Sequence, residues 1–239
     1  MKIKNIPKHI AIIPDGNRRW ATKRGFQPWI GHRAGMKIVE KILLKAKEMN
    51  LSYLTFWVGS WDNLTQRKKI EIKFLFKLYH EYFKKALKDK RVHEDKVKIN
   101  VFGRWKEILP KETQKIIEKA IETTKNYHKY FLTLLIAYDG RDEMINCIEK
   151  IVNLVKMKKV SKITPEIIKE NLWTKDLPPV DLVIRTGCEE DPHLSAGFMM
   201  WDTSYSQLYF TKTLFPDFTP EEFENIIKDY SQRERRMGR

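Results

Sequence analysis

The stretch that decides the fold is residues 9–20, which read HIAIIPDGNRRW. Its apolar start is typical of a buried strand, and the turn at Gly16 leads into a helix that begins near Arg18 and Arg19. Helix N-termini and arginine side chains both bind phosphate groups well. Asp15 supplies the oxygen ligand that Mg²⁺ prefers. The stretch therefore predicts a site for a metal-bound phosphate group at the end of a strand.

Outward from this stretch, short apolar runs alternate with longer helical patterns. The apolar runs predict strands at residues 10–14, 51–58, 97–102, 131–137, 180–184 and 207–211. Helical periodicity is clearest over residues 31–50, 70–87, 113–127 and 141–155. Strands that alternate with helices of this length indicate parallel βαβ units. We predict an α/β fold with one mainly parallel sheet, covered on both faces, in a single domain over residues 1–239.

Polar clusters follow four of the predicted strands directly. They lie at residues 15–19, 59–63, 138–141 and 185–187. Because parallel strands end at the same edge of a sheet, and ligands bind there, these clusters are expected to face one site. Taken singly, each has a structural explanation: Asp15 and Gly16 as a helix cap and turn, and Arg18 and Arg19 as surface charge. Their common placement favours an enzyme that handles phosphate groups.

The composition indicates which partners and compartment to expect. The 239 residues include 46 basic and 31 acidic side chains, a net charge of +15. Such a field attracts phosphates, nucleic acid or an acidic membrane face, but no recognised nucleic-acid motif is present, so we expect no nucleic-acid partner. Cys147 and Cys188 have neither a metal-site nor a disulfide pattern, which fits a reduced cytosol. Residues 1–7 lack the apolar core of a signal peptide, so we expect a cytoplasmic protein.

Several blocks of sequence resemble one known family. Residues 9–21 (HIAIIPDGNRRWA), 31–35 (GHRAG), 181–186 (DLVIRT), 205–210 (YSQLYF) and 233–238 (RERRMG) are similar to the cis-prenyltransferases, which include the undecaprenyl diphosphate synthases. The resemblance implies about six parallel strands wrapped by helices, an apolar product tunnel and a homodimer. It also implies an Mg²⁺-dependent enzyme that joins an allylic prenyl diphosphate to isopentenyl diphosphate. The product would be a cis-polyprenyl diphosphate, a lipid carrier precursor, released through a peripheral contact with the inner membrane face.

The resemblance also assigns roles to individual positions. It makes Asp15 the metal ligand and the residue most needed for catalysis, and Asn63 a candidate in proton removal. The residues implied to bind the allylic diphosphate are Gly16, Asn17, Arg18, Arg19, Trp20 and His32. Ser60 and Asn63 match the polar pair that follows the second strand in the family. Arg185 and Ser195 match its isopentenyl diphosphate pocket. The terminal Arg236 and Gly238 would reach the diphosphate of a neighbouring subunit.

The chain departs from the family pattern around both diphosphate sites. Pro28 and His193 stand where the family usually has arginines, and Arg67 falls one place later than expected. Gln207 replaces a glutamate that normally helps to bind the metal, so it is a doubtful second metal ligand. Each lost charge-assisted contact is worth on the order of 1.5–3 kcal/mol. We keep Arg67 as a substrate-binding candidate despite its shifted position. We also keep His193, because a protonated imidazole retains part of an arginine's role.

These departures leave two alternatives open. A divergent synthase of the same fold would make a short, branched or irregular product by non-head-to-tail condensation. A non-catalytic partner subunit is the other, but such subunits tend to lose the first-strand aspartate, and Asp15 is present. Asp202 and Glu189 are available to replace the missing glutamate. The product tail is expected against one helical face, for which core packing is the alternative: Phe74, Leu75, Leu78, Tyr82 and Phe83.

Overall fold

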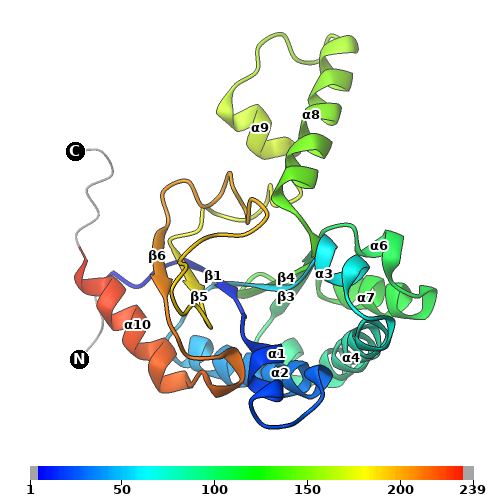
Figure 1. Ribbon diagram of the computed structural model, residues 1–239. Coiled ribbons are helices and arrows are strands. Elements are labelled where there is room, and N and C mark those ends of the chain that lie inside the picture. The colour runs from blue at the N-terminus through cyan, green and yellow to red at the C-terminus, as the bar shows by residue number, and fades with distance from the viewer. Residues whose placement is uncertain (1–4, 234–239) are drawn as a thin grey trace.

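A parallel sheet forms the centre of the computed structural model, which describes residues 5–233 (Figure 1). Its strand order is β3-β4-β2-β1-β5-β6, and every neighbouring pair is parallel. The strands are β1 (His9–Ile13), β2 (Tyr53–Ser60), β3 (Val97–Phe102), β4 (Tyr130–Tyr138), β5 (Leu182–Arg185) and β6 (Gln207–Phe210). All six predicted strands are confirmed, and β1 lies at the centre, where both of its neighbours fix its register.

Helices connect the strands as the periodicity predicts. The long ones are α2 (Pro28–Glu48), α4 (Lys69–Lys88), α7 (Lys111–Thr124), α8 (Gly140–Lys156) and α10 (Pro220–Gln232). The short ones are α1 (Asn17–Thr22), α3 (Trp61–Gln66), α5 (Lys90–Glu94), α6 (Trp105–Ile108), α9 (Pro165–Asn171) and the 3₁₀ turn η1 (Phe215–Asp217). Helix α3 begins at Ser60, whose hydroxyl accepts a hydrogen bond from the N–H of Asn63 at 3.0 Å. This cap places two predicted site residues next to each other at the end of β2.

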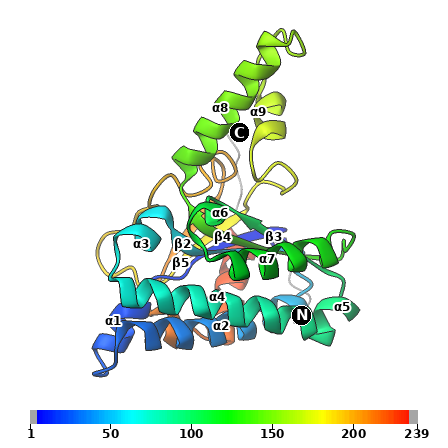
Figure 2. The same ribbon diagram turned by 90° about the vertical axis from the view of Figure 1, so that its right-hand side faces the viewer.

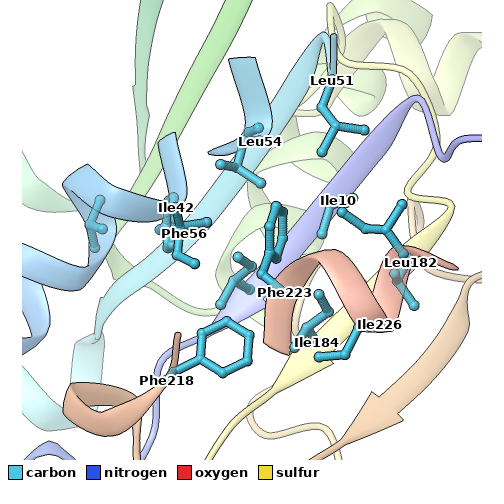
Figure 3. Close-up of a cluster of buried hydrophobic side chains, with 14 of the residues drawn as sticks. Ile10, Ile42, Leu51, Leu54, Phe56, Leu182, Ile184, Phe218, Phe223 and Ile226 are labelled. Atoms are coloured by element: carbon cyan, nitrogen blue, oxygen red, sulfur yellow. The ribbon is translucent and has the colours of Figure 1, made fainter. Parts of the chain in front are cut away.

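One face of the sheet is covered by α2, α4, α7 and α10. Side chains alternate along β1, so Ile10 and Ile12 face these helices. Figure 3 shows Phe223 and Ile226 of α10 lying over the sheet, with Ile184 of β5 beside them. Both strand faces are apolar, as expected for a buried parallel sheet. The carboxyl end of β1 is thereby held rigidly between α2 and its neighbouring strands.

The opposite face is covered differently from the prediction. Phe198 and Met199 of the segment before β6 pack on Trp57 of β2 and Val183 of β5, so an irregular segment rather than a layer of helices buries this face. Helices α8 and α9 project away from the sheet instead (Figures 1 and 2). They form a small core of their own around Cys147. The projecting α8 leaves a row of apolar side chains exposed: Ile145, Ile148, Val152 and Val155.

None of the helices within residues 5–233 combines the length and the apolar character needed to cross a bilayer.

Candidate active site

A polar cavity of about 760 Å³ lies at the carboxyl ends of β1, β2 and β5. It is the edge at which ligands bind in open parallel sheets. Most of the predicted site residues line it: Asp15, Gly16, Asn17, Arg18, Arg19, His32, Ser60, Asn63, Arg67, Arg185 and Ser195. Arg141, from the cluster after β4, lines the cavity as well, so the structure brings together clusters that follow four different strands in the sequence.

Asp15 occupies the end of β1 and faces two arginines. Gly16, at a φ of 98°, turns the chain there, and its N–H donates to Asp15 Oδ1 at 2.5 Å. A side chain at position 16 would collide with Leu214, and its φ would be strained, so the turn requires glycine. Arg185 Nη2 donates to Asp15 Oδ2 at 3.0 Å, and Arg19 Nη2 lies 3.4 Å from Oδ1. The carboxylate is thus held by opposite charge on both of its oxygens.

Arg185 is nearly buried but keeps one donor free. Its Nη1 donates to the carbonyl of His193 at 2.7 Å and to Ser195 Oγ at 3.0 Å. Its Nε is buried without an acceptor among the described residues, and the same holds for Nε1 of Trp57, which also lines the cavity. A buried donor without a partner is costly. Two such donors at one cavity fit an anionic ligand whose oxygens would accept from them.

A buried carboxylate gathers the basic residues on the other side of the cavity. Glu71, in the first turn of α4, is 2 % exposed. Its Oε1 lies 3.0 Å from His32 Nε2, 3.2 Å from Arg67 Nη1 and 3.7 Å from Arg18 Nε. Arg67 Nη2 donates in turn to Asn63 Oδ1 at 2.7 Å. One carboxylate on α4 therefore links three basic side chains that line the cavity.

The protonation states in this cluster follow from burial and charge. Burial lowers the pKa of His32, and its hydrogen bond with Glu71 only partly opposes this, so the ring is neutral at neutral pH. Burial raises the pKa of Glu71, but the His32 hydrogen bond and the charge of Arg67 outweigh it, and the net pKa is lowered. Glu71 is thus ionised. The cluster therefore places two arginines at the cavity, and the single negative charge of Glu71 pairs with both of them.

Sequence reasoning missed Glu71 and Trp57. Glu71 stands four residues after Arg67, a spacing at which opposite charges meet on a helix, and this signal could have identified it. Trp57 lies within an apolar strand and has the sequence context of a core residue. Only the three-dimensional structure shows that its N–H lacks a partner among residues 5–233.

Three predicted residues lie outside the cavity lining. Trp20 donates from Nε1 to Asp217 at 2.6 Å, because α1 turns it toward η1. The His193 ring bonds to Asp191 at an exposed loop, so its carbonyl and not its imidazole contacts Arg185. Gln207 stands at the first position of β6, opposite the first residue of β5, and its Oε1 accepts from Arg233 at 3.3 Å. Within one chain, Gln207 is therefore at the wrong end of its strand to reach Asp15.

The other positions singled out in the sequence, where they fall within residues 5–233, contribute no additional charge to the cavity lining. Pro28 starts α2 and contributes backbone shape rather than charge. Asp202 is buried and forms an ion pair with Lys169 at 2.5 Å, so it does not replace the missing glutamate. Glu189 lies 3.7 Å from Arg19, which lines the cavity. Arg236 and Gly238 fall outside the described residues.

The site fits Mg²⁺ only together with a phosphate ligand. Within residues 5–233, no group of three or more His, Cys, Asp or Glu side chains could hold a metal ion. Mg²⁺ usually takes one or two carboxylates and completes its shell with water and substrate phosphate. Asp15 is the one predicted metal carboxylate that lines the cavity, and the free donors of Arg185 and Trp57 suit phosphate oxygens. The donor set therefore agrees with a metal that arrives with a diphosphate.

An apolar cavity adjoins the polar one. Val58 of β2 lines both, and the apolar cavity then runs between the sheet and the helices α2 and α4 to Tyr130. Along α2 it extends from Met36 to Lys47, about 16 Å of helix. Of the side chains predicted for a tunnel, Tyr82 and Phe83 line it.

The other three tunnel candidates lie elsewhere on α4. Leu75 and Leu78 are buried core residues, and Phe74 packs on Trp29, with ring centroids 6.3 Å apart. They lie outside the cavity lining because α4 turns them toward its neighbouring helices and the core. Two of the five candidate side chains therefore line the apolar cavity, and its role as a product tunnel stays a prediction.

The parallel sheet, the arginine-rich cavity at its carboxyl edge and the adjoining apolar cavity fit an enzyme that binds a diphosphate with an apolar tail. A family model described as putative undecaprenyl diphosphate synthase matches residues 13–238, so the chain belongs to this family and is a prenyltransferase.

Individual relatives and solved structures support this family assignment. The chain is 42% identical over 236 residues to a tritrans,polycis-undecaprenyl-diphosphate synthase (geranylgeranyl-diphosphate specific) from Pyrococcus furiosus, covering 98% of this chain and 88% of that protein. It is 40% identical to an isoprenyl transferase from Fusobacterium nucleatum, covering 98% and 97%. Among solved structures, lavandulyl diphosphate synthase from Lavandula x intermedia, in complex with dimethylallyl diphosphate, superposes with a TM-score of 0.90 at 28% identity, covering 98% and 99%.

Proposed function

We propose that the chain joins geranylgeranyl diphosphate to isopentenyl diphosphate repeatedly and makes a cis-polyprenyl diphosphate. The observation that carries the proposal is that the arginine-rich cavity and the apolar cavity lie next to each other and share Val58 in their linings. A diphosphate among the arginines would leave its prenyl chain pointing into the apolar cavity between α2 and α4. The name of the Pyrococcus furiosus relative supports geranylgeranyl diphosphate as the starter.

The chemistry follows from charge and position. The C–O bond of the allylic diphosphate breaks, and Arg18 and Arg19 stabilise the charge that grows on the departing diphosphate. Arg185 and Ser195 hold the diphosphate of isopentenyl diphosphate, so that its terminal double bond faces the allylic carbon. A new C–C bond forms, and a proton leaves the adjacent carbon. Asn63 is the candidate that positions the acceptor for this proton, with its amide held by Arg67.

Mg²⁺ would be held by Asp15 and diphosphate oxygens, and it would supply further positive charge to the leaving group. The chain's own residues bind and orient the two diphosphates. The buried Glu71 keeps Arg18 and Arg67 beside each other despite their like charges.

We also propose that the protein is a homodimer and that α8 contributes its interface. Its apolar row is 44–56 % exposed, and the members recur at helical spacing on one side of the projecting helix. A second copy of the same helix would cover this row. The roles that the family resemblance implies for three further residues stay predictions for this dimer. Gln207 is a doubtful second metal ligand, and Arg236 and Gly238 would reach the diphosphate of the neighbouring subunit. A cytoplasmic location and a peripheral contact with the inner membrane face are further parts of the proposal.

A second candidate function is irregular condensation of two short units. The TM-score of 0.90 with lavandulyl diphosphate synthase favours it, as do the altered loops around Arg67 and His193. The length of the apolar cavity favours the regular reaction instead, because a short branched product would leave most of it empty.

Product analysis distinguishes the two functions. The purified protein is incubated with Mg²⁺, isopentenyl diphosphate and either dimethylallyl, geranyl, farnesyl or geranylgeranyl diphosphate. A further incubation supplies Mg²⁺ and dimethylallyl diphosphate alone, the ligand in the lavandulyl diphosphate synthase structure. A ladder of cis products, made fastest from geranylgeranyl diphosphate, is the expected result. A single branched product would establish the second candidate, and no prenyl transfer with any starter would refute both.

A further inference from the structure

Helices α2 and α4 concentrate the positive charge of the molecule. Helix α2 carries five basic and two acidic side chains. Helix α4 carries six basic and two acidic side chains, and one of its acidic side chains, Glu71, is buried. These helices therefore hold nearly half of the net charge of +15. The neighbouring α10 is the reverse, with four acidic side chains and one basic. The charge is thus localised and not a general property of the surface.

The two helices lie side by side and run in the same direction (Figure 2). Trp29 meets Phe74 near their starts, and Lys47 meets Asp95 beyond their other ends. Exposed lysines on both helices have no ion pair or hydrogen bond with any residue in the described part of the chain: Lys37, Lys41, Lys73, Lys84 and Lys88. We call these five side chains the basic face.

The apolar cavity reaches the surface between these same helices. Leu44, 42 % exposed on α2, belongs to its lining. So do both partners of two ion pairs that bridge the opening. Lys85 Nζ lies 2.6 Å from Glu40 Oε1, and Lys47 Nζ lies 2.6 Å from Asp95 Oδ2. Because these pairs are partly solvent-exposed, they close the opening only weakly.

We propose that the basic face docks on an anionic lipid bilayer and that the apolar cavity opens toward it between α2 and α4. The proposal rests on the proposed function, since a bound prenyl chain is what would pass from the cavity into the bilayer. Lysines close to an anionic membrane each strengthen binding by about fivefold, and salt screens the effect. A nucleic acid would also fit the charge, but it would not account for an apolar cavity whose lining includes the exposed Leu44 of a lysine-bearing helix.

Vesicle sedimentation tests the docking with two charge-matched variants. One combines Lys37→Glu, Lys41→Glu and Lys84→Glu on the basic face. The control combines Lys158→Glu, Lys159→Glu and Lys162→Glu, three exposed lysines in the loop that connects α8 to α9 and outside the proposed dimer interface (Figure 1). The wild type and the control are expected to bind phosphatidylglycerol-rich vesicles and not phosphatidylcholine vesicles. The basic-face variant is expected to bind at least tenfold more weakly, with circular dichroism unchanged.

Three results would overturn the proposal: no binding by the wild type, an equal loss in both variants, or binding of RNA in preference to anionic vesicles. Should the glutamate variant not fold, the corresponding Lys→Gln variants give the same comparison with half the charge change.

A second measurement separates this inference from the proposed function. Anionic vesicles are expected to accelerate multiple turnovers of the wild type and of the control but not of the basic-face variant. A single turnover in detergent is expected to proceed equally in all three. Vesicle binding without any prenyl transfer would refute the proposed function alone. Normal prenyl transfer with identical vesicle responses in the three proteins would refute the docking surface alone.

Discussion

Arg185 Nη2 lies 3.0 Å from Oδ2 of Asp15, so the cation at the end of β5 neutralises the carboxylate at the end of β1. The register of the two strands places Ile13 opposite Arg185 and so imposes this contact. A diphosphate that takes Arg185 as its partner would release Asp15, and a metal ion that takes Asp15 would release Arg185. The pair therefore makes the binding of the two ligands interdependent.

The first prediction is that Mg²⁺ and a diphosphate bind cooperatively. Calorimetry with an unreactive analogue of isopentenyl diphosphate, the substrate whose diphosphate Arg185 is proposed to hold, is expected to show Mg²⁺ binding about tenfold tighter than without the analogue, a coupling of roughly 1.4 kcal/mol. In Arg185→Gln, Asp15 has lost its partner, so Mg²⁺ alone is expected to bind more tightly than in the wild type, while the analogue binds more weakly. Equal Mg²⁺ affinity with and without the analogue would contradict the exchange.

The second prediction concerns Asp15 itself. Asp15→Ala removes the proposed metal ligand and is expected to lower turnover by about a hundredfold or more, since charge stabilisation of the departing diphosphate is the largest contribution to such a reaction. The fold is expected to persist because the side chain is 38 % exposed. Steady-state kinetics and circular dichroism check both parts. Wild-type turnover in this variant would refute the assignment.

The third prediction tests the positioning role of Glu71. Glu71→Gln keeps the size and one acceptor oxygen but removes the charge that holds Arg18 and Arg67 together. The KM for the allylic diphosphate is expected to rise about tenfold with a smaller change in kcat, as for lost positioning of a binding group. The hydrogen bond with Glu71 raises the pKa of His32, so its weakening is expected to lower that pKa further in an NMR titration.

Glu81→Gln is the control for this experiment. It lies on the same helix and is exposed, with long ion-pair contacts to Arg33 at 3.7 Å and to Lys77 at 3.9 Å. If Glu71→Gln only reduced thermal stability and left both the KM and the His32 titration unchanged, Glu71 would be a structural residue.

The strands and the centre of the site could be predicted from the sequence because both depend on local patterns. Apolar runs mark all six strands, and the carboxyl ends of parallel strands must meet, which brings Asp15, Asn63 and Arg185 to one cavity. This inference needs no knowledge of side-chain packing.

The residues that the sequence could not place depend on packing between distant segments. Trp20 is turned away by its hydrogen bond to Asp217, which lies 197 positions later in the chain. The spacing of Glu71 from Arg67 predicts an ion pair between them, but only burial beside α2 makes Glu71 the centre of a cluster that includes His32 and Arg18. The short helices α5 and α6 contain too few residues to show a period.

The last prediction concerns His9, which is fully buried at the start of β1. Its Nδ1 donates to the Pro178 carbonyl at 2.8 Å, because a carbonyl can only accept, and its Nε2 accepts from Thr55 Oγ1 at 2.8 Å. Both ring nitrogens are thus satisfied in the neutral form. Burial lowers the pKa of His9, and the hydrogen bond to Pro178 opposes this only in part.

The unfolded chain takes up a proton at this ring near pH 6.5, whereas the folded chain does so only at lower pH. The free energy of unfolding is therefore expected to fall as the pH decreases from about 7 to the lowered pKa, by up to about 1.4 kcal/mol per pH unit for one proton. His32 has the same sign, so His9→Gln is expected to flatten the slope without abolishing it. Urea denaturation at several pH values measures the slope. If His9→Gln kept the full wild-type slope, the neutral buried state of His9 would be refuted, because that state requires the unfolded chain to bind one more proton than the folded chain.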